Sequence, residues 1–386
     1  MAKTHQRILN LRELLEKKSF FLFGPRATGK STLIRRQLQA DSTVIIDLLG
    51  LRTYREFLAH PEGLEDFVLA HAKIEKPTVV IDEIQKIPEL LNEVHRLIEA
   101  RGWRFLLTGS SARSLKAKGV NFLAGRAWTA ELFPLCHPEI GDLDLDKRLR
   151  FGTLPAVYNS NYPDEDLDAY VSTYLKEEIL SEGLARNLVA FSDFLKVAGL
   201  SQSKVMNMNK LARDLGISQP TVRSYYQILQ DTFIGTMLPP LDLSKKRKAI
   251  THAKFFMFDM GVVHAMTETR SLDRNSTLYG DAFESYLISE VKAYVSYRRT
   301  KDQLYFWRTT SGDEVDLVVG KKAAFEFKAT TKIQTSDVDG LRRLGEEQII
   351  PFLAVVSQDK FETVNHGIRR MHWQTFLADL WADKLI

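Results

Sequence analysis

The sequence predicts an α/β protein in which a parallel sheet carries a phosphate-binding loop, followed by a helical middle region and a second α/β domain. The segment 24–31, Gly-Pro-Arg-Ala-Thr-Gly-Lys-Ser, fits the pattern G-x-x-x-x-G-K-[ST]. The apolar segment 77–83 ends in two adjacent carboxylates. A second set of acidic residues follows in the segment 313–328, in a pattern typical of paired strands.

Length and charge limit the possible organisation. A chain of 386 residues is long for one hydrophobic core, so we expect about two or three domains, which we place at 1–140, 141–250 and 251–386. The 53 Lys and Arg residues against 49 Asp and Glu residues give a formal net charge of +4. Such a mildly basic chain neither requires nor excludes a nucleic-acid partner, whose site would have to be a local patch.

The use of cysteine and the hydropathy pattern favour a cytoplasmic protein. The single cysteine, Cys136, allows no internal disulfide and suits a reducing compartment, and we expect it to be buried. The longest apolar run, near 349–356, contains Pro351 and is too short to span a bilayer. Because the N-terminus is charged and polar, unlike a secretory signal, no membrane partner is expected.

The loop at 24–31 has the flanks that nucleotide binding requires. The apolar segment 19–23 predicts a buried strand before it, and 32–38 has helical spacing after it. A helix N-terminus offers unpaired amides and a positive dipole end, which favour an anion. Lys30 is expected to reach the β- and γ-phosphates of ATP, and the Ser31 hydroxyl to bind Mg²⁺.

Two further predicted strands supply polar groups to the same edge of the sheet. The segment 43–47 predicts an intervening buried strand, and 77–83 has the form of a Walker B strand. Asp82 is expected to hold Mg²⁺, and Glu83 to orient or activate the attacking water. The residues expected to bind the nucleotide are Gly24, Pro25, Arg26, Ala27, Thr28, Gly29, Lys30, Ser31, Thr32, Asp82, Thr108 and Ser110.

Further candidate residues of the nucleotide site come from the strand predicted at 104–111 and from the Gly-Arg pair after it. Thr108 and Ser110 could both hydrogen-bond phosphate or the lytic water. A transferring phosphoryl group needs a cation in its transition state, and an arginine can supply it from the same chain or from a neighbour. Arg126 is the first choice for this role and Arg113 the second, with a solvated surface arginine as the alternative for each. A homo-oligomer follows if Arg126 acts on a neighbour.

These motifs resemble those of a prokaryotic family of AAA-type P-loop ATPases. The matching segments are Gly24–Thr32, Asp82–Glu83, Thr108–Ser110, Gly125–Arg126 and Leu132–Leu135. The resemblance implies an AAA-type fold, ATP and Mg²⁺ as cofactors, and a C-terminal domain of unknown function.

The sequence of the middle region predicts a helix-turn-helix at 209–222, in which Ser218 is the N-cap of the second helix. A DNA-reading version would present Gln219, Thr221, Arg223 and Gln227 to the major groove. The alternative is a winged-helix module that only packs or assembles the protein. The supposed recognition helix has one arginine and two tyrosines, which favours the packing role. The basic run at 245–248 is either a phosphate contact or a solvated loop.

The C-terminal part resembles restriction-endonuclease-like folds in the spacing of Asp316, Glu326 and Lys328 on two predicted strands. Such a site uses carboxylates to bind Mg²⁺ and a lysine to stabilise charge or activate water. Glu284, on a predicted apolar helix face, would join Asp316 and Glu326 as a metal ligand, because a carboxylate there needs a partner. The simpler alternative is a solvent-facing sheet in which Glu326 and Lys328 form an ion pair.

Three functions are compatible with this pattern. In the first, ATP hydrolysis drives action on nucleic acid, DNA being favoured, through a nuclease-like C-terminal domain in which Lys328 is catalytic; whether this domain cleaves stays open. In the second, a regulatory or signalling ATPase uses its C-terminal domain and winged helix only to bind a partner or DNA. The third hypothesis is a DNA-binding regulator that uses the helix-turn-helix.

Overall fold

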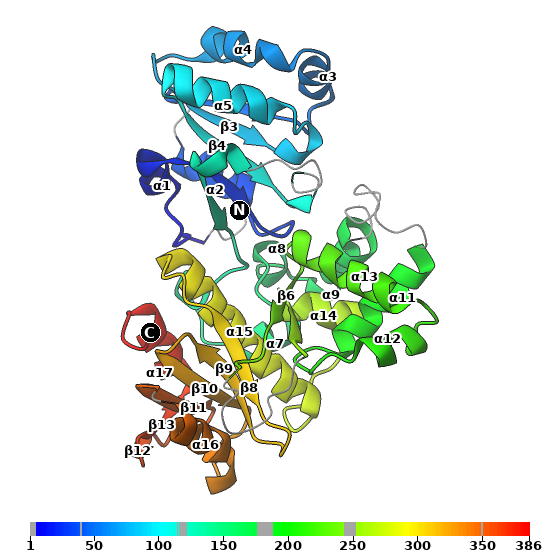
Figure 1. Cartoon of the computed structure of the whole chain (residues 1–386), viewed down its shortest axis with the longest axis vertical. Coiled ribbons are helices and arrows are strands. Elements are labelled where there is room, and N and C mark those ends of the chain that lie inside the picture. The colour runs from blue at the N-terminus through cyan, green and yellow to red at the C-terminus, as the bar shows by residue number, and fades with distance from the viewer. Residues whose placement is uncertain are drawn as a thin grey trace. The chain divides into compact units, whose positions relative to one another are not determined.

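The computed structural model describes residues 5–38, 41–113, 115, 122–175, 188–242, 252–348 and 350–386 (Figure 1). They form two compact units, each of which is described by itself. The N-terminal unit comprises Gln6–Phe133 and Asp231–Ile234, and the C-terminal unit comprises Pro134–Gln230 and Gly235–Ile386 with His5. The three-part division at 140 and 250 stays a prediction.

A five-stranded parallel sheet organises the N-terminal unit. The strands are β1 (Ser19–Phe23), β2 (Thr43–Asp47), β3 (Thr78–Asp82), β4 (Arg104–Gly109) and β5 (Ala127–Glu131). Their order across the sheet is β2-β3-β4-β1-β5, and all neighbours run parallel. Each residue of β1 is buried, as its fully apolar sequence predicts for an interior strand of a parallel sheet. The α/β class predicted for this region is confirmed.

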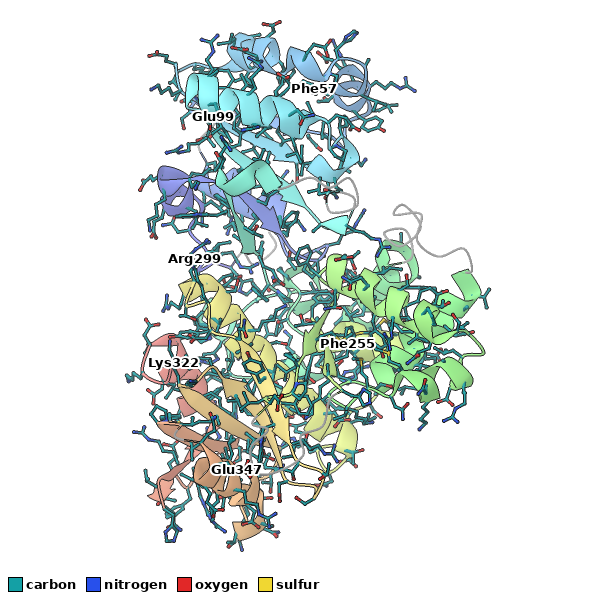
Figure 2. All side chains as sticks on the ribbon, in the orientation of Figure 1. Phe57, Glu99, Phe255, Arg299, Lys322 and Glu347 are labelled. Carbon is teal, nitrogen blue, oxygen red and sulfur yellow. The ribbon has the colours of Figure 1, made fainter. Side chains whose placement is uncertain are left out.

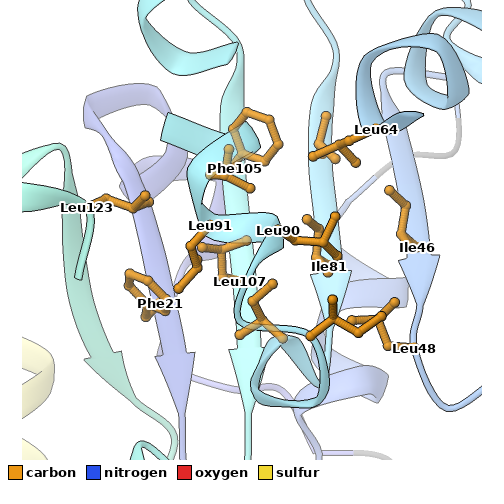
Figure 3. Packing of buried hydrophobic residues seen from close by; sticks show 14 of the residues in the cluster. Phe21, Ile46, Leu48, Leu64, Ile81, Leu90, Leu91, Phe105, Leu107 and Leu123 are labelled. Atoms are coloured by element: carbon orange, nitrogen blue, oxygen red, sulfur yellow. The ribbon is translucent and has the colours of Figure 1, made fainter. Parts of the chain in front are cut away.

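Helices cover both faces of this sheet. They are α1 (Leu11–Lys17), α2 (Lys30–Gln37), α3 (Leu51–Ala59), α4 (Leu64–His71) and α5 (Leu90–Arg101), with short 3₁₀ turns η1 (Pro61–Gly63), η2 (Ile84–Lys86) and η3 (Phe122–Gly125). Figure 1 shows α3, α4 and α5 on one face, and α1 and α2 on the other. Alternate strand residues such as Phe21, Ile81 and Leu107 pack beneath Leu90 and Leu91 of α5 (Figure 3). This core fixes the sheet edge that carries the phosphate-binding loop.

The C-terminal unit begins with helices. They are η4 (His137–Glu139), α7 (Leu145–Phe151), α8 (Pro155–Tyr158), α9 (Pro163–Ala169), the π-helix η5 (Tyr170–Leu175), α11 (Leu188–Leu200), α12 (Met208–Asp214), α13 (Gln219–Asp231) and α14 (Met260–Met266). Between α13 and α14 lie the antiparallel strands β6 (Gly235–Leu238) and β7 (Lys254–Met257). Cys136 is buried, as predicted.

The predicted helix-turn-helix corresponds to α12 and α13. The Asn207 side chain accepts a hydrogen bond from the backbone N–H of Lys210 at 3.0 Å, and Ser218 Oγ accepts from that of Thr221 at 3.3 Å. Tyr225 and Tyr226 are buried against an aromatic cluster formed by Phe191, Phe194 and Phe255. The two tyrosines therefore serve packing, as the composition of the helix indicated. Figure 2 labels Phe255 on β7.

A mixed six-stranded sheet ends the chain. Its strands are β8 (Leu304–Arg308), β9 (Glu314–Val319), β10 (Ala323–Lys328), β11 (Phe352–Ser357), β12 (Thr363–Asn365) and β13 (Ile368–His372), in the order β12-β13-β11-β10-β9-β8. The helical segments are α15 (Thr277–Arg298), η6 (Thr335–Val338), α16 (Asp339–Glu347) and α17 (Trp373–Trp381). The antiparallel pairing of β9 with β10, in which Leu317 faces Phe325, confirms the predicted strand, turn and returning strand.

Two further predictions concern a phosphate contact at the basic run and the lack of a membrane partner. The basic run 245–248 lies outside the described residues. Within the described ranges, no helix has both the length and the apolar character needed to cross a membrane.

Candidate functional site

The phosphate-binding loop packs tightly against the chain beyond β5. Gly24 has φ +150°, and a Cβ atom there would lie 2.4 Å from the backbone oxygen of Leu132. Only glycine fits at such a close approach. Ala27 also has a positive φ, +63°, in the left-handed region that non-glycine residues seldom adopt. A strained, closely packed loop of this kind holds its backbone amides in one arrangement before any ligand arrives.

Lys30 lies against the loop backbone. The side chain is 7% exposed, and its Nζ donates hydrogen bonds to the carbonyl oxygens of Gly24 at 2.6 Å and Pro25 at 3.0 Å. Thr28 Oγ1 donates to the same Pro25 oxygen at 2.9 Å. Lys30 begins α2, so the ammonium group lies beside the N-terminal turn of that helix, where anions are favoured.

The edge at which β1, β3 and β4 end brings the predicted Mg²⁺ ligands together. Ser31 Oγ donates to Asp82 Oδ2 at 3.0 Å, and Thr108 Oγ1 donates to Asp82 Oδ1. Because β4 lies between β3 and β1, Thr108 is placed beside the Walker B carboxylate. Hydroxyl and carboxylate oxygens are the ligands that Mg²⁺ prefers, and it commonly takes one or two carboxylates together with substrate phosphates. Ser31 and Asp82 therefore fit a Mg²⁺ site that ATP would complete.

Glu83 is held by residues from two segments. It has φ +61°, an uncommon backbone conformation for a non-glycine residue, at the turn after β3. Ser110 Oγ donates to Glu83 Oε2 at 3.5 Å, and Gln85 Nε2 donates to the same oxygen and to Ser110 Oγ. The sequence prediction missed Gln85, whose only signal is its place two residues after Glu83. A Cβ atom at Gly109 would lie 2.5 Å from Gln85 Oε1, so glycine there leaves room for the amide.

Arg126 lies at the wrong edge of the sheet to act on the nucleotide of its own chain. It directly precedes β5, whose first residue, Ala127, pairs with Ser19 at the start of β1. The phosphate-binding loop follows the other end of β1. The Arg126 guanidinium pairs with Glu99 of α5, labelled in Figure 2, and this contact lowers the pKa of Glu99. The expectation of Arg126 acting within one chain is therefore corrected, and action on a neighbour stays a prediction.

Arg113, the second choice, lies on the side of the sheet where β4 ends. Its guanidinium is 3.5 Å from Asp231 Oδ2, and the N–H of Ala112 donates to the Asp231 backbone oxygen at 3.0 Å. The last residue of α13 thus contacts the segment that follows Ser110.

In the C-terminal unit, two of the predicted acidic residues, Glu284 and Asp316, lie beside a lysine that the sequence prediction missed. Lys254 Nζ of β7 lies 3.0 Å from Glu284 Oε1, 2.6 Å from Glu314 Oε1 and 3.7 Å from Asp316 Oδ1. Glu326 Oε1 accepts a hydrogen bond from Lys328 Nζ at 2.6 Å. We call these six residues the carboxylate cluster.

The carboxylate cluster is buried, and burial is the largest influence on the pKa values of Glu284, Glu326 and Lys254. Asp316 and Glu326 are each 6% exposed, so the solvent-facing sheet considered as the alternative is wrong, although its ion pair exists. Burial, together with the negative charge of Asp316, raises the pKa of Glu284 to about 8 and that of Glu326 well above its usual value. Burial alone would lower the pKa of Lys254, but the carboxylates around it raise that pKa.

The described residues do not show the predicted metal site as a formed group of ligands. In the part of the chain that the structure describes, no three His, Cys, Asp or Glu side chains are arranged to hold a metal ion. The physical reason at the carboxylate cluster is that the ammonium group of Lys254 lies among the oxygens of Glu284, Glu314 and Asp316. The binding of Mg²⁺ by Glu284, Asp316 and Glu326 stays a prediction, and the position of Lys254 counts against it.

A further acidic residue of α15, Glu290, belongs to a separate buried network. Its Oε1 accepts from the backbone N–H of His137 at 2.8 Å, and its Oε2 accepts from Trp381 Nε1 at 2.9 Å. Tyr286 and Arg148 lie beside it, joined by a hydrogen bond of 2.7 Å. This network ties η4, α7, α15 and α17 together and has a structural role.

Replacing Glu290 with glutamine should flatten the pH dependence of stability between about pH 5 and 7.5. Burial raises the pKa of Glu290 from 4.5 to about 7, so the folded protein holds more protons than the unfolded chain in this window. Stability therefore falls as pH rises through the window, by at most about 1.4 kcal/mol per pH unit for one group. Urea unfolding of both proteins across this range measures the slopes.

The neighbouring His137 does not change its charge in the folded protein between about pH 5 and 7.5, so it adds nothing to the difference in slope between the two proteins. Burial and the charge of Arg148 lower the pKa of His137 to about 4, so it stays neutral throughout the window. Equal slopes for the original protein and Glu290→Gln would contradict the prediction.

Matches to protein-family models divide the chain into three segments. Residues 16–141 match an AAA domain. Residues 142–275 match a domain of unknown function (DUF8612), and residues 279–374 match another (DUF4143). The first match agrees with the geometry of the loop and sheet, so residues 16–141 are similar to AAA domains in sequence and in sheet architecture. The other two lend no support to a restriction-endonuclease-like domain.

Three relatives, each described as an uncharacterized protein, are similar to this chain in sequence. Those of Mycobacterium bovis and Mycobacterium tuberculosis are each 26% identical over 321 residues, which cover 80% of this chain and 70% of theirs. One from Haemophilus influenzae is 23% identical over 308 residues, 69% of this chain and 72% of its own.

Two solved structures are similar to this chain at low TM-scores, which establish no shared fold. The Bacillus subtilis DNA clamp loader delta protein is 12% identical, covers 57% of this chain and 86% of its own, and has a TM-score of 0.25. A DNA polymerase III gamma subunit-related protein of Thermotoga maritima is 10% identical, covers 87% and 90%, and has a TM-score of 0.23.

Proposed function

We propose that this chain hydrolyses ATP in a Mg²⁺-dependent reaction at the N-terminal unit. The observation that carries the proposal is the single sheet edge at which the loop, the Ser31–Asp82 pair and Glu83 meet. The match of residues 16–141 to an AAA domain supports ATP as the nucleotide.

Each residue at this edge has a role in the proposed reaction. The loop amides and Lys30 bind the phosphates, while Ser31 and Asp82 hold Mg²⁺, which neutralises phosphate charge when it is bound. Glu83 orients a water molecule toward the γ-phosphoryl group and accepts its proton as ADP leaves with the bridging oxygen. Thr108 fixes Asp82 through a hydrogen bond, and Ser110 and Gln85 do the same for Glu83.

We further propose that ATP turnover is coupled to nucleic acid, DNA being favoured, through the C-terminal unit. The exposed face of α13 carries Arg223 and Gln227, which supports contact with a phosphate backbone or base edges. The alternative is a regulatory or signalling ATPase whose C-terminal unit binds a partner or DNA without cleavage. The position of Lys254 among the carboxylates favours binding over cleavage, since it leaves no metal site of the predicted kind.

The testing experiment measures phosphate release by the purified chain with Mg²⁺, with EDTA, and for Asp82→Asn. Turnover should require Mg²⁺ and fall to background in the variant, because the carboxylate that holds the ion is lost. Turnover that is unchanged by EDTA and by the substitution would refute the ATPase proposal.

A second arm adds single-stranded, duplex and branched nucleic acids, with and without ATP. Binding should weaken steeply as salt concentration rises, because phosphate contacts release counterions. Failure to bind any of these nucleic acids would refute the coupling while leaving the ATPase proposal intact.

A further inference from the structure

Lys254 has the surroundings of a bound cation. Its side chain is 4% exposed, and three carboxylates from α15 and β9 lie within 4 Å of its Nζ. An ammonium group has three N–H donors and no acceptor; Glu284 and Glu314 lie within hydrogen-bond distance of it, and Asp316, at 3.7 Å, attracts it electrostatically. The ring of Phe306, with its centroid 5.5 Å from Nζ, adds a further group that attracts a cation.

The oxygens of the carboxylate cluster differ in whether they have a hydrogen-bond or cationic partner. Asp316 Oδ2 accepts from the backbone N–H of Phe327 at 2.8 Å, and Glu326 Oε1 accepts from Lys328. Glu326 Oε2 is buried and has no hydrogen-bond partner, in a residue that is 6% exposed. Four carboxyl groups therefore share two ammonium groups and the guanidinium of Arg308, which lies 3.4 Å from Glu314 Oε2, and one buried oxygen remains available to a cation.

A divalent ion and the Lys254 ammonium cannot occupy this position together. Mg²⁺ draws its oxygen ligands to about 2.0–2.1 Å in a near-octahedral shell. The ammonium group already contacts Glu284 and Glu314 at 3.0 and 2.6 Å, so a metal ion there would have to displace it. Displacement would leave a buried lysine without its charged partners, which is strongly unfavourable.

We propose that the ammonium group of Lys254 is the resident cation of the carboxylate cluster, so that this site holds no divalent metal and cleaves no nucleic acid by a metal-dependent route. The inference concerns the C-terminal unit alone and is independent of ATP hydrolysis. It predicts that removal of the ammonium turns a lysine site into a metal site.

The test compares Mn²⁺ binding to the full chain without nucleotide, by calorimetry and electron paramagnetic resonance, for the original protein, Lys254→Met and Lys292→Met. Lys292 is the control, a partly buried lysine of α15 whose Nζ donates to Thr236 Oγ1 at 2.7 Å. Any Mn²⁺ bound by the phosphate-binding loop is common to all three proteins. We expect Lys254→Met alone to bind about one further Mn²⁺ per chain, and its unfolding temperature alone to rise as Mn²⁺ is added.

Two results would overturn the proposal. One is a Mn²⁺ site in the original protein that Glu326→Gln abolishes, because the cluster would then hold a metal beside its lysine. The other is a folded Lys254→Met protein that gains no Mn²⁺. If Lys254→Met does not fold, the comparison of the original protein with Glu326→Gln decides alone, and equal Mn²⁺ binding by the two supports the proposal.

Discussion

Replacing Lys30 with alanine is expected to lower ATP turnover by at least about 100-fold, the loss typical of removing one preorganised charged or hydrogen-bonding group from a transition-state site. The ammonium is buried beside the loop and the first turn of α2, where the phosphates are proposed to bind. Steady-state phosphate release, together with titration of a fluorescent ATP analogue, measures turnover and binding separately.

Lys17→Ala provides the matched control for this experiment. Lys17 lies in the same unit, but its side chain is 55% exposed and pairs with Glu13 on the surface of α1. It should hydrolyse ATP like the original protein. Equal turnover by Lys30→Ala and Lys17→Ala, with both proteins folded by circular dichroism, would show that the loop is not the phosphate site.

Replacing Glu83 with glutamine is expected to separate ATP binding from hydrolysis. The substitution keeps the size of the side chain but removes the base, for which losses of about 10²–10⁴-fold are usual. Nucleotide affinity should stay near that of the original protein, because Lys30, Ser31 and Asp82 are unchanged. Single-turnover hydrolysis and equilibrium binding of the same ATP analogue give the two quantities.

Two further variants show whether Glu83 acts as proposed. Glu56→Gln, on the exposed surface of α3, removes a carboxylate without touching the site and should leave turnover unchanged. Gln85→Ala should give an intermediate loss, since Glu83 would keep only Ser110 as a side-chain partner near its carboxylate. A Glu83→Gln protein that hydrolyses ATP at the original rate would exclude Glu83 as the base.

Short motifs predicted most residues of the proposed nucleotide site. Each motif lies at the end of a single strand, so it could be recognised without knowledge of the rest of the fold. The loop, the Asp82–Glu83 pair and the Thr108 strand could each be found from a short segment. The order of the strands could not, yet it is this order, with β4 between β3 and β1, that lets Thr108 contact Asp82. The same limit explains the error at Arg126. A Gly-Arg pair does not tell which end of a strand it precedes, whereas the register of β5 on β1 does.

The carboxylate cluster shows a different limit of sequence reasoning. The spacing of Asp316, Glu326 and Lys328 correctly predicted two paired strands. Glu284 of α15 lies in the same cluster, in contact with Lys254, while its role as a metal ligand stays a prediction. Lys254 carries no motif and is contributed by a strand distant in sequence, so no local pattern relates it to these residues. Its charge nevertheless decides what the cluster can bind.

The N-terminal unit is discontinuous in sequence, and this affects how it can form during synthesis. Thr232 and Ile234 are buried in it, and Phe233 stacks on Phe23 of β1 with ring centroids 5.3 Å apart. A nascent chain of 140 residues contains the whole parallel sheet but lacks these side chains and the Asp231 partner of Arg113. Domains tend to fold in order as they leave the ribosome. Here the last segment of the unit is made nearly a hundred residues after its sheet, so we expect the packing of the unit to be completed only after residue 234 has been synthesised.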